Sequence, residues 1–328
     1  MKRIAYFVHG RGRGHASRSL TIVPKIQALG HEFRLFGGGN ADDLLDNFAE
    51  YKRLAPVMPD LSGPRVLPRR FLGDVRRLRR FRPHLVISDG DMPSVLAARW
   101  LGIPSLAIGH DLVFWRCRLP TTLPKKHLRA ERLSGLVASR ATFGIAVHFL
   151  PAEILAPNTY LARPALRPTL EGAVEDGEHI LCYFRDPIGR RVLSEAESTG
   201  ARFIAFGDDL GQLPDIPIQR FDQRRFSELL RSCRAVIASA GSTLLAECIL
   251  LGKPVMALHK RRDSEQLLNS ILIERARVGA RCQFESVTAK DIERFITGVE
   301  RKSYQQIDLA NEVRTVPEVV VEVLSKIL

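Results

Sequence analysis

The stretch AVIASAGSTLLAECILLGKPVMALHKRRDSEQLLN, residues 235–269, carries the pattern that decides the fold. Its first five residues, 235–239, form a short apolar run that is typical of a buried parallel strand. Small residues at 240–243 predict a turn, and apolar residues at helical spacing over 244–251 predict a helix. A second apolar run at 255–258 completes a strand–helix–strand unit, which indicates an α/β protein.

The turn and the helix start form a candidate anion site. The first N–H groups of a helix lack partners inside the helix and carry partial positive charge, which suits a diphosphate. Ser239, Gly241, Ser242 and Thr243 surround this position, and the Ser and Thr hydroxyls can also cap the helix. Glu247, further along the helix, is placed to reach ribose hydroxyls. An ordinary strand–helix–strand unit with a capped helix explains the same residues, so spacing alone leaves both interpretations open.

The stretch resembles the donor-binding half of the GT-B glycosyltransferases, which have two Rossmann-like domains. Within them it is most similar to family 28, which includes the N-acetylglucosaminyltransferase that makes lipid II. The family pattern is Ser-x-Gly-x-x-Thr/Leu-x-x-Glu, then Gly-x-Pro, then Asp-x-x-Gln-x-x-Asn. Here the three parts stand at Ser239–Glu247, Gly252–Pro254 and Asp263–Asn269.

The resemblance implies a role for each matching residue. Gly241–Thr243 would hold the diphosphate, Glu247 the ribose, and Glu265 with Gln266 the sugar. The family often has two adjacent Gln residues where this chain has Glu265 and Gln266, which leaves the identity of the sugar open.

A second departure from family 28 follows the expected strand 180–184. The family has a Gly-Gly-Ser phosphate turn there, whereas this chain reads RDPIGR from Arg185 to Arg190. We expect the Arg185 or the Arg190 side chain to supply the charge that the missing turn would have supplied.

Near the N-terminus, the expected strand at 4–8 runs into Gly10-Arg-Gly-Arg-Gly-His15 and then a helical pattern. The dinucleotide fingerprint is excluded because its third glycine is missing. His15 falls at the carboxyl end of the strand, where a histidine can act as a general base near pH 7. A helix-start histidine bonded to local backbone is the alternative. The family's Gly-x-Gly-His turn matches Gly12, Gly14 and His15, which implies that the two glycines lie on the acceptor side.

Two more strands, 83–88 and 105–108, end in polar residues. Asp89 follows the first, and His110 with Asp111 follows the second. Because parallel strands end at one edge of a sheet, we expect these side chains to lie near His15. Asp89 or Asp111 would then orient or charge-pair His15, and His110 would lie on the acceptor side. A helix cap or a loop hydrogen bond is the alternative for each, and it is the expected role of Asp91.

The charge of the chain is concentrated in one half. The 328 residues carry a net charge of +13, with 25 Lys and Arg against 11 Asp and Glu in residues 1–150, and 24 against 25 in residues 151–328. An anionic partner for the first half is therefore expected. The segment 67–82 is an amphipathic, Arg-rich helical pattern, which suggests a surface for anions or for a lipid bilayer, although such a run is more often a solvated face.

Several function classes are disfavoured. No window reaches the roughly 18 apolar residues of a membrane span, and the first residues read as a strand rather than a signal peptide. The five cysteines lack CxxC spacing, so we expect buried free thiols and no metal site. Free thiols are typical of the cytoplasm, where we expect the protein to be located. If 67–82 binds lipid, the protein would lie on the inner face of the membrane. The basic run lacks interleaved aromatic residues, so nucleic acid is not an expected partner. No cofactor is expected.

These observations predict two Rossmann-like domains facing across a cleft. Residues 1–160 with a returning helix at 312–328 would form the acceptor domain, and 165–311 the donor domain. Within them we expect a short helix at 41–51, a loop at 56–68 and the interdomain crossing at 151–168.

The predicted function is inverting, metal-independent sugar transfer to a hydroxyl acceptor, anionic or lipid-linked. The donor is a nucleoside diphosphate sugar, with UDP the favoured nucleotide. Two alternatives remain. A nucleotide-sugar epimerase or hydrolase would use a carboxylate pair such as Asp263 and Glu265, and a non-catalytic protein would bind anionic polymers.

Overall fold

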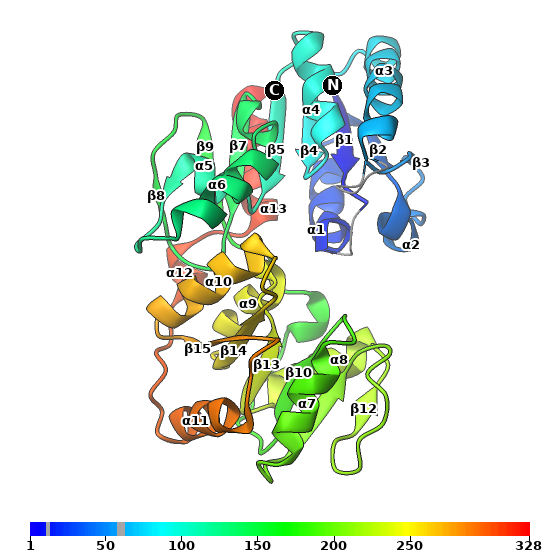
Figure 1. Ribbon diagram of the computed structural model, residues 1–328. Helices are drawn as coiled ribbons and strands as arrows, with labels where there is room; N and C mark the ends of the chain where they lie inside the picture. Colours follow the sequence, from blue (N-terminus) through cyan, green and yellow to red (C-terminus); the bar gives the residue numbers. More distant parts are fainter. Residues whose placement is uncertain (11–13, 58–62) are drawn as a thin grey trace. The chain divides into compact units, whose positions relative to one another are not determined.

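A computed structural model describes residues 1–10, 14–57 and 63–328, with the side chains of 63 and 64 left out. The chain forms two compact units, which are coloured along the sequence in Figure 1. Unit 1 comprises Met1–Pro120, Arg132–Ala165 and Val313–Leu328, and unit 2 comprises Thr121–Glu131 and Leu166–Glu312. This division differs from the expected one at Thr121–Glu131, which packs with unit 2. Each unit is built on a parallel sheet, so the predicted α/β class is confirmed.

In the described part of unit 1, the main sheet has the strand order β3-β2-β1-β4-β5-β7-β9, with all pairs parallel. Its strands are β1 (Arg3–Val8), β2 (Glu32–Gly37), β3 (Tyr51–Arg53), β4 (Leu85–Asp89), β5 (Ser105–Gly109), β7 (Phe143–Val147) and β9 (Thr159–Ala162). A short antiparallel pair is formed by β6 (Cys117–Arg118) and β8 (Glu153–Ile154). The helices are α1 (Gly14–Ala28), α2 (Asp42–Leu45), α3 (Gly63–Phe81), α4 (Met92–Trp100), α5 (Leu112–Arg116) and α13 (Val316–Ile327), while α6 (Lys125–Ser134) begins in unit 2 and ends in unit 1.

The unbroken apolar run of β1 is explained by helices on both faces of its sheet. Ile4, Tyr6 and Val8 belong to a buried cluster that includes the apolar faces of α1 and α13. Ala5 and Phe7 point the other way, into a cluster with α3 and α4. Alternate residues of one strand thus supply two separate cores.

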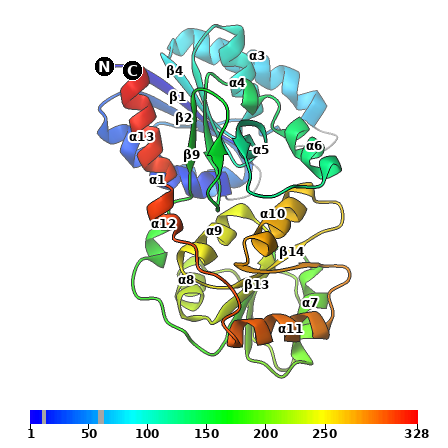
Figure 2. The same cartoon turned by 90° about the vertical axis from the view of Figure 1, so that its left-hand side faces the viewer.

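The helix α13 belongs to unit 1 although it follows the whole of unit 2 in sequence. Val316, Val319, Val320, Val323 and Leu324 pack in the same core as α1, and the two helices lie side by side in Figure 2. Backbone bonds fix its start, because Arg163 N–H donates to Arg314 O and Val316 N–H donates to Arg163 O. A Thr315–Glu318 capping box begins the helix.

In the described part of unit 2, the sheet has the strand order β12-β11-β10-β13-β14-β15 and is also parallel. Its strands are β10 (Ile180–Tyr183), β11 (Phe203–Phe206), β12 (Ile218–Gln219), β13 (Ala235–Ser239), β14 (Val255–His259) and β15 (Gly279–Gln283). Its helices are α7 (Gly189–Glu197), α8 (Gln223–Ser232), α9 (Ser242–Leu250), α10 (Ser264–Arg275), α11 (Ala289–Glu300) and α12 (Leu309–Glu312). The strand β13 lies between β10 and β14. The stretch 235–269 therefore begins with a central strand of this sheet.

Two local expectations were wrong. The helix expected at 41–51 is the single turn α2, and Tyr51 already belongs to β3. The loop expected at 56–68 gives way to α3 from Gly63 onward, with Pro68 inside the helix. The chain passes from unit 1 to unit 2 between Ala165 and Leu166, inside the expected crossing at 151–168. That range also contains β9, whose pairing with β7 extends the sheet of unit 1.

Candidate functional site

The candidate site of unit 1 lies at the carboxyl edge of its sheet. Asp89 ends β4, Gly109 ends β5, and Gly14 begins α1 with His15 as its second residue. Gly12, which was expected on the acceptor side, lies outside the described residues. Because neighbouring parallel strands end at the same edge, residues far apart in sequence come together here.

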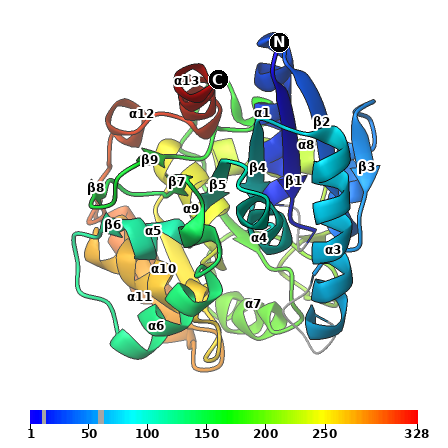
Figure 3. The same ribbon diagram turned by 90° about the horizontal axis from the view of Figure 1, so that it is seen from above.

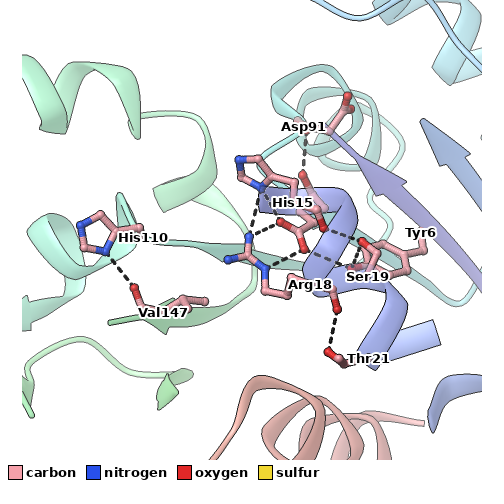
Figure 4. Close-up of polar contacts among 10 residues, drawn as sticks. Tyr6, His15, Arg18, Ser19, Thr21, Asp91, His110 and Val147 are labelled. Atoms are coloured by element: carbon pink, nitrogen blue, oxygen red, sulfur yellow. Dashed lines mark hydrogen bonds and ion pairs between the residues drawn. The ribbon is translucent and has the colours of Figure 1, made fainter. Parts of the chain in front are cut away.

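The structure brings His15 and Asp89 into direct contact. The distance from His15 Nδ1 to Asp89 Oδ1 is 2.6 Å, and the Asp89 side chain is fully buried while His15 keeps 29 % of its side chain exposed (Figure 4). Gly90 makes this contact possible. Its φ is +69°, and an ideal Cβ there would lie 2.5 Å from His15 Cε1, so the imidazole occupies space that only glycine leaves open.

Asp89 is held as a carboxylate by its neighbours. Tyr6 Oη donates to Asp89 Oδ2 over 3.1 Å, and Arg18 Nε donates to the same oxygen over 3.0 Å. Burial alone would raise the pKa of Asp89, but the Arg18 guanidinium and the His15 hydrogen bond outweigh burial and hold the pKa well below its usual range. The acidity is therefore set by ion pairing.

The His15–Asp89 bond determines what the imidazole can do. A carboxylate oxygen only accepts hydrogen bonds, so Nδ1 of His15 carries the proton. The neutral ring then presents its lone pair on Nε2, which is the arrangement of a general base oriented by a carboxylate. Arg18, Tyr6 and Ser19, whose Oγ lies 3.0 Å from Tyr6 Oη, complete the network.

Asp111 and His110 occupy the end of the neighbouring strand. Asp111 precedes α5, but its side chain makes no capping hydrogen bond. Burial raises the pKa of Asp111, while the charges of His110 and His15 act in the opposite direction. His110 Nδ1 donates to Val147 O over 2.9 Å, and its ring stacks on Phe149. Asp89 is thus the hydrogen-bonded partner of His15, and Asp111 is a nearby charge.

In unit 2, the candidate anion site is the turn between β13 and α9. Gly241 is the N-cap of α9, with φ −79° and ψ 130°, and no side chain makes a capping hydrogen bond. The expectation that Ser242 or Thr243 caps this helix was therefore wrong. A Cβ at Gly241 would meet nothing within 4 Å, so the space in front of the first turn is open. An uncapped and accessible first turn is suited to an anion.

Glu247 forms an ion pair with Arg167 in unit 2. Its two carboxylate oxygens accept hydrogen bonds of 2.7 and 2.6 Å from Arg167, which the sequence analysis did not single out, and Glu247 is only 2 % exposed. Burial raises the pKa of Glu247, and Arg167 opposes that effect. If Glu247 binds the ribose as expected, its carboxylate has to accept hydrogen bonds from the ribose hydroxyls and from Arg167 at the same time.

The start of α10 orders the residues expected at the sugar. Asp263 caps α10 by accepting from Gln266 N–H at 3.0 Å, so it serves the helix rather than a carboxylate pair with Glu265. Glu265 is exposed. Asn269 is buried and donates to Ala240 O over 2.9 Å, which ties α10 to the β13–α9 turn.

Two cationic residues follow the strands on either side of β13. Arg185 follows β10, is exposed, and donates to Tyr183 Oη over 2.8 Å. Lys260 follows β14 and forms an ion pair with Asp186, which belongs to the segment in the place of the Gly-Gly-Ser turn. Arg190, by contrast, donates to the carbonyl of Leu210 over 2.9 Å and braces a loop.

The residues that the structure describes contain no group of three or more His, Cys, Asp or Glu side chains placed to hold a metal ion. In the same part of the chain, no helix combines the length and apolar character needed to cross a bilayer.

The two parallel α/β units have the fold of a known class of proteins, the GT-B glycosyltransferases. MurG of Acinetobacter baumannii superposes with a TM-score of 0.71 and 16 % identity, covering 99 % of this chain and 100 % of that one. Arabidopsis thaliana UGT89C1, solved in complex with UDP-L-rhamnose, gives a TM-score of 0.68 and 14 % identity, with 99 % of each chain covered. These structures establish the GT-B fold.

The family follows from the sequence comparison. The model of Glycosyl transferase family 1 matches residues 2–300, and the chain belongs to this family. An uncharacterized glycosyltransferase of Methanosarcina mazei is 26 % identical over 92 % of this chain and 91 % of its own length. The chain is therefore an enzyme of the glycosyltransferase class, and the alternative of a non-catalytic polymer binder was wrong. The matching model is that of family 1, so the finer resemblance to family 28 stays a prediction.

Proposed function

We propose that this protein transfers a sugar from a nucleoside diphosphate sugar, with UDP as the favoured nucleotide, to a hydroxyl acceptor with inversion and without a metal ion. The observation that carries the proposal is the His15–Asp89 pair, with a 2.6 Å bond to a buried carboxylate on one ring nitrogen. The other nitrogen, Nε2, is then able to accept the proton of an acceptor hydroxyl.

The proposed reaction is a single displacement. The acceptor oxygen forms a bond to the anomeric carbon, its proton passes to His15 Nε2, and the bond from that carbon to the diphosphate oxygen breaks. Attack on the face opposite the leaving group inverts the anomeric configuration. Asp89 supports the imidazolium that forms, as a carboxylate does for a general-base histidine, and Asp111 is proposed to assist through its electrostatic interaction with His15.

The leaving diphosphate is proposed to bind at Ser239 and Gly241–Thr243. The uncapped first turn of α9 offers N–H donors and the positive end of a helix dipole, worth about half an elementary charge. Arg185, which follows β10, and Lys260, which follows β14 and pairs with Asp186, are proposed to supply cationic charge to the diphosphate. Glu247 is assigned to the ribose and Glu265 with Gln266 to the sugar. The Arabidopsis thaliana enzyme bound to UDP-L-rhamnose supports the choice of UDP.

The acceptor is proposed to be lipid-linked and presented at an anionic membrane surface. An apolar groove of about 580 Å³ lies between α3 and α4, which are adjacent in Figure 3. Its lining consists of Leu67, Pro68, Phe71, Leu96, Arg99 and Trp100. Trp100 is 70 % exposed. The face of α3 that points away from the core carries several exposed arginines. Apolar residues framed by arginines are the composition of interfacial membrane contacts.

The first experiment separates donor binding from chemistry. Wild type is expected to be stabilised against heat by UDP in the presence of EDTA, by about 2.7 kcal/mol at 100 times Kd. The variant His15→Ala is expected to keep this stabilisation, because the proposed donor residues belong to unit 2, and to lose sugar transfer by about 10²- to 10⁴-fold. Product stereochemistry is read by NMR of the anomeric proton.

The matched control is His84→Ala, an exposed histidine that precedes β4, whereas Asp89 ends that strand. Its transfer rate is expected to equal that of wild type. Retention of the anomeric configuration, loss of activity in EDTA, or an active His15→Ala variant would each contradict the proposed mechanism.

A further inference from the structure

Arg18 is the charged residue of the unit 1 site whose role the mechanism above leaves open. It lies three residues after His15 on α1, and its side chain is 13 % exposed. Its guanidinium touches both members of the catalytic pair. Nε donates to Asp89 Oδ2 over 3.0 Å, a terminal nitrogen donates to Asp89 Oδ1, and the same nitrogen lies 3.0 Å from His15 Nδ1 (Figure 4).

His15 Nδ1 lies within hydrogen-bond distance of both Asp89 and Arg18, but it can form a hydrogen bond with only one of them. A neutral imidazole has one N–H and one lone pair, so Nδ1 cannot both donate to Asp89 and accept from Arg18. The 2.6 Å contact with a carboxylate, which only accepts, assigns the proton to Nδ1. Arg18 therefore donates to Asp89, and relative to His15 it is a fixed positive charge beside the ring.

The consequence for His15 follows from the signs of the charges. A lone carboxylate beside Nδ1 favours the imidazolium, and a base that is already protonated cannot take a proton from an acceptor. Arg18 forms a two-oxygen ion pair with that same carboxylate and brings the local charge of the pair close to zero. An imidazole beside such a compensated carboxylate keeps the orienting hydrogen bond and releases its second proton more readily.

We propose that Arg18 is a positioning residue that clamps Asp89 and, by compensating its charge, keeps His15 uncharged and active as a base at lower pH than an uncompensated His–Asp pair would allow. This inference rests on the proposed function, because it concerns the base of that reaction. It adds a residue that matches neither motif of the sequence analysis, and it predicts a pH dependence rather than a loss of structure.

Other titratable groups also lie near the His15–Asp89 pair, and the variants of the test leave all of them unchanged. Directly after β1, the ring of His9 meets that of His15 edge-on, with centroids 5.6 Å apart. From the end of β5, the Asp111 carboxylate interacts with His15 through charge. Tyr6 contacts Asp89 from inside the sheet and stays neutral, because burial and the Asp89 charge raise its pKa well above the ordinary value.

The test compares Arg18→Gln with Arg18→Lys and Asp89→Asn. Arg18→Gln removes the compensating charge, so the acid limb of the kcat/KM profile is expected to move to higher pH by about one unit, the size typical of a neighbouring charge. This corresponds to about a tenfold loss on the acid limb with a much smaller loss on the alkaline plateau. Arg18→Lys, which keeps the charge, is expected to leave the acid limb in place.

Asp89→Asn provides the opposite sign. It removes the negative charge and leaves Arg18, so the acid limb is expected to move to lower pH. Arg18→Gln and Asp89→Asn each leave one member of a largely buried ion pair without its partner, so both are expected to be destabilised, and thermal melting shows whether they fold. Arg18→Lys keeps both charges, and an acid limb that moved in this variant would contradict the proposal.

A second measurement does not depend on sugar transfer. The NMR titration of the His15 ring, assigned by its loss in His15→Gln, is expected to move to higher pH in Arg18→Gln and to lower pH in Asp89→Asn. Equal rate losses at every pH with an unchanged ring titration would overturn the proposal and leave Arg18 a structural residue. A shifted ring titration in a protein without transferase activity would instead support the Arg18 inference and reject the proposed function.

Discussion

At the scale of single residues, the site of unit 1 depends on the absence of a side chain at Gly90. The backbone there has φ +69°, and the His15 ring fills the space in which a Cβ would lie. Gly90→Ala is expected to reduce sugar transfer by about 100-fold, because a displacement of roughly 1 Å in a catalytic group has that effect. The rate of transfer and the melting temperature are measured together.

Gly102→Ala is the control for this substitution. Gly102 has nearly the same φ, +66°, but a Cβ there would meet nothing within 4 Å. Both variants are expected to lose about 1–2 kcal/mol of stability from the left-handed backbone, and only Gly90→Ala to lose activity beyond that. Equal activity in the two variants would mean that the position of the His15 ring does not limit the reaction.

Catalytic candidates at strand ends could be predicted from the sequence, while their partners could not. The carboxyl ends of parallel strands share an edge, which is why Asp89 was expected near His15. Arg18 and Arg167 were missed, since a lone arginine carries no pattern that names its partner. Glu247 lies 80 residues from Arg167, and only the fold joins them.

At the scale of secondary structure elements, the long apolar runs were predicted correctly and the short edge strands β3 and β9 were not. Strands such as β1 and β13 are buried on both faces and show as continuous apolar segments. The edge strands β3 and β9 have only three and four residues with mixed polarity. Their conformation is decided by pairing with a neighbour, which a local pattern does not contain.

The uncapped start of α9 leads to a prediction about this element. An aspartate at the N-cap stabilises a helix, but its charge occupies the place of an anionic ligand. Gly241→Asp is expected to raise the melting temperature slightly and to weaken UDP binding at least tenfold. Calorimetric titration with UDP gives the affinity.

The neutral cap Gly241→Asn separates charge from capping. It is expected to stabilise α9 similarly and to bind UDP more tightly than the aspartate variant, because it adds no negative charge. Undiminished UDP binding by Gly241→Asp would place the diphosphate elsewhere than at this helix start.

At the scale of the whole molecule, the excess charge of residues 1–150 and the α3–α4 groove lead to a test of membrane contact. The protein is expected to sediment with vesicles containing anionic phosphatidylglycerol and not with vesicles of phosphatidylcholine, and added salt should release it. Leu72→Asp, at a leucine 54 % exposed on α3, is expected to weaken sedimentation about tenfold.

The matched control is Leu133→Asp on α6, where the leucine is 73 % exposed but lies on neither α3 nor α4. This variant is expected to sediment like wild type. Equal losses in both variants, or equal binding to the two kinds of vesicle, would contradict a membrane contact through α3 and α4.

The return of α13 to unit 1 has a consequence for how the chain is made. A ribosome completes every strand of unit 2 before it releases the residues that cover the apolar face of α1 and its sheet. During that interval unit 2 has all of its own sequence, whereas unit 1 waits with part of its core open to water. A chain that ended before α13 would therefore contain the whole sequence of unit 2 but would expose the apolar surface of unit 1 that α13 covers. Chaperones and proteases recognise such exposed apolar surfaces.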